Sequence, residues 1–425
     1  MTLPYDFENS RDLKAWLDTL PEEKLVVGLY VYNNNTTQDE WLNPLARHLR
    51  EHGFATIGIV DPSKAQQVEL SSADATALIP APEISNLERI NVFIISDVDS
   101  CINFPLSSRI LACCHGTMTK HETCMPCDGS IPANVDGWLC SYPLSPRTRE
   151  WTSDVMTGFH RPDRTKRKSG NFHIIPCGYP RAGALVEQLA GIPSAPDAIV
   201  YAPVGMVMYP DMGGMRVRQH GEALLRVLLQ GFPDKKVIFR PYKTDIDREE
   251  VKNICAAFSD EKRFLLDTTP QRLFAFSRGE VLITDYSHIG QSFALCTGRP
   301  AIVFTPWEKG EDAPETATGA RVRSYESLLN IVQKAMSDAA KQRIDRSRKE
   351  IAMPVENALA ELAALIRDFF EDRPRPDWLT IRRNDWSLLQ DEKTLLEKLH
   401  RHPATSAALF LFRNPESPLL AAAAL

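Results

Sequence analysis

The sequence predicts an α/β protein in which two doubly wound parallel-sheet domains follow one another and helices end the chain. Short apolar segments rich in β-branched residues recur, and segments with helical spacing separate many of them. This pattern starts again after a proline-rich connection at 191–196. A length of 425 residues also exceeds what one ordinary core holds. We therefore expect a first domain at 1–190, a second at 191–372 and a helical tail at 373–425.

The first domain begins with a strand–helix–strand unit. Segments 24–32 and 54–60 are apolar and predict strands, and segment 39–52 between them has the spacing of a helix. Further strands are expected at 90–95, 110–114, 138–142 and 172–176. Strands joined in this way predict a parallel sheet with helices on both faces.

The second domain repeats the alternation more regularly. Strands are expected at 198–202, 236–240, 263–267, 281–284 and 301–304, and helices at 221–229, 249–258, 270–278 and 289–297. The segment from 324 to 372 is mostly helical in pattern, and further helices are expected from 375 onward. Open parallel sheets bind ligands outside the carboxyl ends of their strands, so two such domains predict a cleft between facing strand ends.

The bulk composition excludes several classes of protein. A formal net charge of −6 gives no support for nucleic-acid binding. There is no run of 18 apolar residues, and the first residues lack the basic and apolar regions of a signal peptide. Nine cysteines, several inside apolar runs, indicate reduced thiols. We therefore expect a cytoplasmic protein.

Two segments leave open a peripheral contact with the inner face of a membrane. The basic loop at 161–168 predicts either a solvated loop or a contact with an anionic acceptor or lipid head groups. Trp378 and Trp386, beside basic residues, predict either an interfacial anchor or a helix docked on the body of the protein.

A strand that ends in a polar cluster is the most informative segment of the second domain. The apolar run 281–284 is followed by Asp285, Tyr286, Ser287 and His288, and a helix is expected from residue 289. Such a junction presents free backbone N–H groups at the positive end of the helix dipole. The Ser287 hydroxyl and these amides predict a phosphate site.

Three other strand ends carry residues suited to chemistry. His115, followed by Gly116 and Thr117, comes directly after a buried strand, where a neutral imidazole can take a proton from a hydroxyl. The alternative is a hydrogen-bonded structural histidine. Arg240 and Lys243 follow another strand and can neutralise a diphosphate, or else belong to a solvated loop.

The third strand end lies at the predicted domain boundary, where a stiff turn carries Gly178, Tyr179 and Arg181. This predicts a hinge, with Arg181 directed either to the cleft or to solvent.

A metal site and a cofactor are not expected. His121, Cys124 and Cys127 have a spacing that would suit zinc, but no fourth ligand stands at a matching distance. Packed or loop cysteines are therefore the expected state of these thiols.

Five strings occur together in the order seen in one known family. They resemble the CDP-glycerol glycerophosphotransferases, the teichoic-acid polymerases and primases. That family shows Trp-His-Gly-Thr-Pro-x-Lys, Thr-Gly-Tyr-Pro-Arg, Tyr-Ala-Pro-Thr, Leu-Ile-Thr-Asp-Tyr-Ser-Ser and Arg-Pro. This chain has Cys114-His115-Gly116-Thr117-Met118-Thr119-Lys120, Cys177-Gly178-Tyr179-Pro180-Arg181, Tyr201-Ala202-Pro203-Val204, Leu282-Ile283-Thr284-Asp285-Tyr286-Ser287-His288 and Arg299-Pro300.

The resemblance implies a GT-B fold and the transfer of an alditol phosphate from a CDP-linked donor to a hydroxyl of a cell-surface polymer or glycan precursor. It implies that His115 is the base. It also implies that Thr284, Asp285, Tyr286 and Ser287 hold the donor phosphates. The partners are then a nucleotide-diphosphate donor and a hydroxyl acceptor.

The chain departs from the family at several positions, above all at Tyr242, where the family has a second histidine. His288 replaces a serine and can supply another imidazole. This departure is compatible with a nucleotide-sugar donor, as in capsule or lipopolysaccharide synthesis. A sugar-nucleotide epimerase and a non-catalytic binding module are the remaining alternatives.

Overall fold

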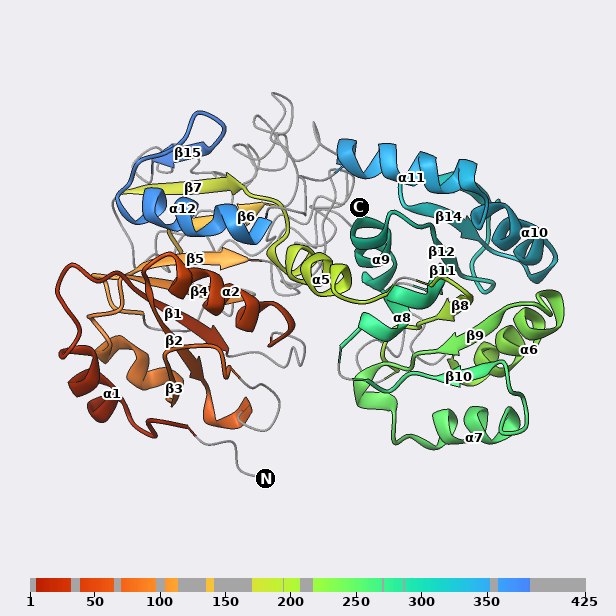
Figure 1. Cartoon of the computed structure of the whole chain (residues 1–425), viewed down its shortest axis with the longest axis horizontal. Helices are drawn as coiled ribbons and strands as arrows, with labels where there is room; N and C mark the ends of the chain where they lie inside the picture. The colour runs from red at the N-terminus through yellow and green to blue at the C-terminus, as the bar shows by residue number, and fades with distance from the viewer. Residues whose placement is uncertain are drawn as a thin grey trace, which may run out of the picture. The chain divides into compact units, whose positions relative to one another are not determined.

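The protein forms two compact units, Met1–Arg181 with Asn357–Leu425, and Ala182–Glu356 (Figure 1). A computed structural model describes residues 5–31, 39–64, 70–96, 104–113, 135–140, 170–193, 195–206, 217–269, 271–285, 287–351 and 358–382. Each unit contains its own sheet with helices packed against it. This is the α/β architecture of two mostly parallel sheets that the sequence predicts.

In the described residues of the first unit, eight strands form one sheet in the order β15-β7-β6-β5-β4-β1-β2-β3. Their bounds are β1 (Val26–Val31), β2 (Ala55–Val60), β3 (Ala75–Leu78), β4 (Val92–Ser96), β5 (Arg109–Cys113), β6 (Gly137–Cys140), β7 (Asn171–Pro176) and β15 (Leu379–Arg382). Strands β1 to β7 pair in parallel, whereas β15 lies antiparallel on β7. The chain adds strands on one side of β1 and then on the other, which makes the sheet doubly wound.

The helices of the first unit bury the apolar positions that predicted them. They are α1 (Ser10–Leu17), α2 (Asp39–Glu51) and α12 (Ala358–Phe370), with short 3₁₀ turns at Pro62–Lys64 and Ala81–Asn86. In α2 the residues spaced as on one helix face, Trp41, Leu45 and Leu49, are at most 2% exposed. Helix α12 packs closely on β6, since a Cβ added at Gly137 would lie 2.7 Å from the Phe369 ring.

In the described residues of the second unit, seven strands follow the order β10-β9-β8-β11-β12-β14-β13. They are β8 (Ala198–Tyr201), β9 (Lys236–Phe239), β10 (Phe264–Leu266), β11 (Gly279–Thr284), β12 (Ala301–Phe304), β13 (Ala313–Thr316) and β14 (Gly319–Val322). All pair in parallel except the β13–β14 hairpin. The winding direction reverses between β8 and β11, the place where such sheets bind ligands.

Helices flank this second sheet. Helix α5 (Pro180–Ala190) crosses the boundary between the units, and α6 (Glu222–Gly231) follows a π-helical turn at Val217–Gly221. The others are α7 (Glu249–Ala257), α8 (Leu273–Arg278), α9 (Ile289–Thr297), α10 (Tyr325–Ala335) and α11 (Asp338–Ile351), with a 3₁₀ turn at Lys243–Asp245. None of the helices described in either unit is long and apolar enough to cross a membrane.

The compact units differ from the predicted domains at two places. The first unit ends at Arg181 rather than at residue 190, and it regains the chain from Asn357 onward. The segment after residue 375 includes strand β15 where only helices were predicted. Trp378 beside it is 4% exposed and packs edge-on to His173 with ring centroids 5.5 Å apart. The Trp378 indole is therefore buried in the first unit, next to a strand rather than on the docked helix of the prediction, and Trp386 lies outside the described residues.

Candidate functional site

The reversal between β8 and β11 brings two strand ends of the second unit together. Asp285, just after β11, accepts a hydrogen bond at Oδ1 from the Val204 N–H in the loop after β8, with N and O 2.8 Å apart. The Thr284 hydroxyl donates to the Ala202 carbonyl in the same loop at 2.6 Å. Both residues are buried: Thr284 is 1% exposed and Asp285 is 5% exposed. These two polar groups therefore fix the position of the β8 loop.

A second carboxylate holds the β8 loop from the opposite side. Asp245 ends the 3₁₀ turn after β9, and its Oδ2 accepts the Met206 N–H at 2.7 Å. Burial raises the pKa of Asp245, whose side chain also has Arg248 Nε 3.3 Å from Oδ1. Because β9 and β11 are the two neighbours of β8, carboxylates from both sides clamp alternate amides of one loop.

Tyr242 packs against this clamped loop. A Cβ built at Gly205 would lie only 2.7 Å from Tyr242 Cδ1, so the ring rests on the bare backbone of the glycine. The residue that stands where the family has a second histidine is thus part of the packing at the end of β8.

Helix α9 begins at the same edge of the sheet. The Ser287 hydroxyl oxygen accepts the Ile289 N–H at 3.3 Å, and the first backbone bond of the helix runs from the Ser292 N–H to the His288 carbonyl. The N–H groups of Gly290 and Gln291 therefore come before the first i to i−4 hydrogen bond of the helix, at the positive end of its dipole.

The glycine in this first turn keeps the helix close to the sheet. A Cβ at Gly290 would lie 3.0 Å from Thr284 Cγ2 and 3.3 Å from Ala301 Cβ, which is tighter than ordinary van der Waals contact. His288 is exposed and has Nδ1 3.4 Å from the Gln291 amide oxygen. The turn from 287 to 291 therefore packs closely on the sheet at the start of α9.

Two basic residues, Arg240 and Lys243, follow the carboxyl end of β9. Arg240 donates from Nη1 to Asp267 Oδ2 at 2.7 Å, and Asp267 is fully buried. Lys243 is exposed on the adjacent 3₁₀ turn. The charge of Arg240 is thus partly offset by Asp267.

Other predicted residues fall outside the described part of the chain. These are His115, Gly116, Thr117 and Tyr286, and also the cluster of His121, Cys124 and Cys127. Strand β5 is described as far as Cys113, two residues before His115 in the sequence. Among the described residues, no group of His, Cys, Asp or Glu side chains has a metal-binding arrangement.

The turn after β7 carries a buried ion pair. Gly178 has a φ of 75°, and Tyr179 and Arg181 are 3% and 5% exposed. Arg181 Nη2 lies 2.9 Å from Glu40 Oε2 at the start of α2. Burial disfavours the charged guanidinium, but Glu40 and Tyr179 more than offset this, so the pKa of Arg181 is raised. Arg181 is therefore directed into the first unit, towards α2.

Comparison with known proteins supports the fold. No family model matches the sequence, and no curated protein matches it. A variant of the wall teichoic acid polymerase TagF is 14% identical, with a TM-score of 0.54, over 85% of this chain and 93% of that one. A putative UDP-N-acetylglucosamine 2-epimerase from Listeria monocytogenes is 13% identical, with a TM-score of 0.52, over 83% and 99%. At these identities the likeness shows the fold, which is the two-domain α/β fold of the GT-B class.

Proposed function

We propose that the protein is a transferase that moves an alditol-phosphate or glycosyl group from a nucleotide-diphosphate donor to a hydroxyl acceptor. The observation that carries this proposal is the junction of β11 and α9, where Ser287 and the first amides of the helix stand at the reversal of strand order. The Thr-Asp-Tyr-Ser string at this junction is the part of the sequence most similar to the glycerophosphotransferases. A CDP-linked donor follows from that similarity, and one TagF structure was solved after a soak with CDPG.

In this proposal the donor diphosphate binds the amides of Gly290 and Gln291 and the Ser287 hydroxyl. Lys243 approaches the phosphates from the next loop, and Arg240 adds positive charge that Asp267 already offsets in part. The clamp on the β8 loop keeps the edge of the sheet rigid. Donors fixed before the substrate arrives stabilise developing charge without reorganisation.

The acceptor hydroxyl would bind the first domain near His115. His115 takes the hydroxyl proton while the acceptor oxygen forms a bond to the transferred group. The bond from that group to the phosphate oxygen of the leaving nucleotide breaks, and the nucleotide departs with its negative charge. We expect His115→Ala to lower turnover roughly 10²- to 10⁴-fold. Turnover near the wild-type rate would remove His115 from the reaction.

A donor screen tests the proposal directly. The full chain is titrated with CDP-glycerol, CDP-ribitol, CMP-linked sugars and UDP-linked sugars, and binding is followed by thermal shift and then by calorimetry. We expect one class to bind clearly more tightly than free CMP or UMP. Equal, weak binding of all compounds would contradict a donor site in this protein.

Ser287→Ala tests whether the donor binds at the β11–α9 junction, and Ser337→Ala is its matched control. Each serine accepts an N–H of the following helix at 3.3 Å, from Ile289 and from Ala340. Both variants therefore lose a serine-to-backbone hydrogen bond at the start of a helix, worth about 1 kcal/mol. Only Ser287→Ala should weaken donor binding, by about tenfold, the equivalent of one charge-assisted hydrogen bond. An equal loss in both variants would assign the effect to stability.

Product analysis separates this function from its alternatives. A glycosyltransferase or glycerophosphotransferase leaves the donor unchanged until an acceptor is added. A 2-epimerase converts a UDP-linked sugar to its epimer without any acceptor, and a binding module yields no product with either. We expect transfer to continue in EDTA, because no metal site is predicted. Activity that vanishes in EDTA and returns with magnesium would overturn this last expectation.

A further inference from the structure

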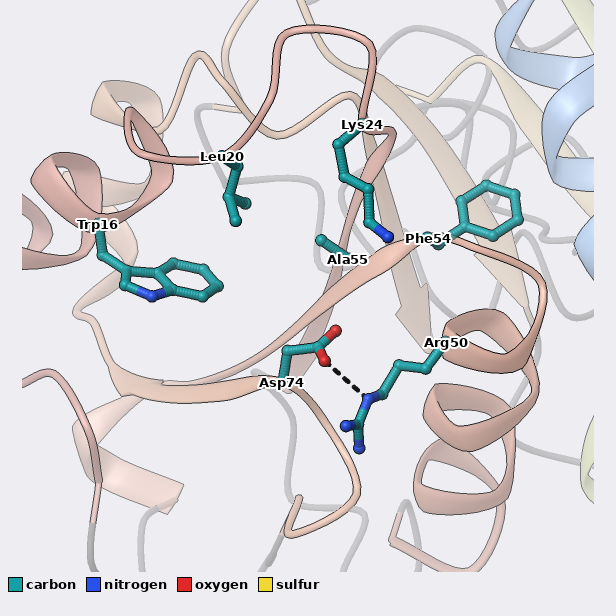
Figure 2. Close-up of a pocket in the computed structure, with 7 residues that line it drawn as sticks. All are labelled: Trp16, Leu20, Lys24, Arg50, Phe54, Ala55 and Asp74. Carbon is teal, nitrogen blue, oxygen red and sulfur yellow. Dashed lines mark ion pairs between the residues drawn. The ribbon is translucent and has the colours of Figure 1, made fainter.

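The first unit contains a pocket of about 320 Å³ that no part of the proposed reaction uses (Figure 2). It is lined by Trp16, Leu20, Lys24, Arg50, Phe54, Ala55 and Asp74. Lys24 precedes β1, Ala55 begins β2 and Asp74 precedes β3, so the pocket lies at the amino ends of these strands. The carboxyl end of β5, the strand that precedes His115 in the sequence, lies at the opposite edge of the same parallel sheet.

One wall of the pocket is apolar and flat. Trp16, on the last turn of α1, is half-buried and packs against Phe7 with ring centroids 5.8 Å apart. Figure 2 shows the indole and the Leu20 side chain directed into the pocket from the same side. Phe54, which also lines the pocket, is 2% exposed beneath the Arg367 guanidinium. An aromatic ring can stack on the Trp16 face with little loss of conformational entropy.

The polar floor carries one net positive charge. Arg50 Nε lies 2.7 Å from Asp74 Oδ1, and Asp74 Oδ2 accepts the Thr56 N–H at 2.8 Å and the Thr56 hydroxyl at 3.2 Å. The charge of the Asp74 carboxylate is thus offset by Arg50, and its oxygens accept hydrogen bonds from Arg50 and Thr56. The Lys24 ammonium points into the pocket in Figure 2, and it makes no ion pair with any described residue. The two cations and one carboxylate together favour an anion.

The segment that carries Lys24 is fixed in place. The Lys24 N–H donates to the Pro21 carbonyl at 3.0 Å. Arg89 Nη2 donates to the carbonyls of Pro21 and Lys24, at 2.7 and 3.0 Å. Arg89 Nη1 is held in turn by Asn91 Oδ1, which also accepts the Val26 N–H at the start of β1. The pocket is therefore preformed, and binding need not order its rim.

We propose that this pocket binds a small aromatic carboxylate. Its ring lies against Trp16 and Leu20, and its carboxylate accepts from the Lys24 ammonium beside the Arg50–Asp74 pair. A volume of about 320 Å³ is at the lower end of ligand pockets and suits one or two fused rings. One net positive charge matches a monoanion, whereas a nucleotide diphosphate would need more donors. The site is independent of the donor site proposed above.

Three indole compounds of nearly equal shape test the charge requirement. Indole-3-acetate is an anion, indole-3-acetamide is neutral and tryptamine is a cation. Their binding to the full chain is measured by saturation-transfer NMR and calorimetry. We expect indole-3-acetate to bind at least tenfold more tightly than the amide, which is the weight of a charge-assisted hydrogen bond, and tryptamine more weakly still. Equal affinities for the three compounds would overturn the proposal.

Two variants locate the binding. Lys24→Met should reduce the preference for the acetate over the amide to about one, and Lys14→Met is the control. Lys14 is exposed on α1, carries the same charge and does not line the pocket. Equal losses in the two variants, or no loss in Lys24→Met, would refute the assignment. A thermal midpoint within about 2 °C of wild type shows that each variant is folded.

Discussion

The buried pair of Arg181 and Glu40 allows the packing of the first unit to be tested quantitatively. Their side chains are 6% and 2% exposed, and the charged atoms lie 2.9 Å apart. Arg181→Met keeps most of the aliphatic volume but leaves the Glu40 carboxylate buried without its cation. Removing one partner of such a pair destabilises a protein by about 3–5 kcal/mol. We expect a loss of that size for this variant.

The double variant separates the pair energy from other effects. Glu40→Gln keeps an acceptor at the same place and should destabilise by less, about 1–3 kcal/mol. Glu40→Gln combined with Arg181→Met removes both charges of this pair. We therefore expect it to be at least 1 kcal/mol more stable than the sum of the two single losses predicts.

Tryptophan fluorescence reports mainly on the first unit, which contains Arg181 and Glu40. Six of the seven tryptophans belong to the first unit, and Trp307 alone belongs to the second. Trp41 is adjacent to Glu40 and 2% exposed. Urea unfolding followed by this emission gives the free energy of unfolding of the first unit. A loss below 1 kcal/mol in Arg181→Met would show that Arg181 is solvated rather than paired with Glu40.

Two further predictions concern other buried groups. Asp285→Ala should lower the unfolding free energy by about 1–3 kcal/mol, because the Val204 N–H loses its acceptor, whereas Asp285→Asn should retain most of it; urea titrations of both distinguish the two. Burial lowers the pKa of His173, despite the hydrogen bond to Asp372 that raises it, so the unfolded chain takes up the proton first. Stability should be full above the ordinary pKa of about 6.5 and fall as pH drops through the lower folded value; a flat profile, or one that matches His173→Gln, would contradict this.

The sequence predicts most of the sheets because strong local patterns accompany most strands. The β1–α2–β2 unit and the strands β8 to β12 combine apolar, β-branched runs with helical spacing, and the structure confirms them. The edge strands β3, β13 and β15, and β14 next to β13, are not predicted from the sequence. They are short, as in Ala75–Leu78 and Ala313–Thr316, and form only through pairing with neighbours.

The candidate site is predictable only in part, for a related reason. The motif at 284–287 locates the junction because a strand, a polar cluster and a helix are contiguous in sequence. Glu40 and Asp245 carry no such signal. Their partners, Arg181 and Met206, lie 141 and 39 residues away, and the contacts exist only after the sheets form. Likewise, nothing local indicated that α12 returns to the first unit.

The direction of the Thr284 and Asp285 side chains bears on how this family of sites can diverge. Both side chains bond to the β8 loop, so in the function proposed above the phosphate contacts come from backbone amides and the Ser287 hydroxyl. Backbone amides bind any phosphate and do not distinguish the group attached to it. Tyr242, which packs on Gly205, stands where the family has a histidine. We infer that such a change alters which group is transferred and leaves the proposed phosphate site intact. We therefore predict that side chains around the junction determine donor identity, and that Tyr242→His shifts donor preference towards CDP-glycerol.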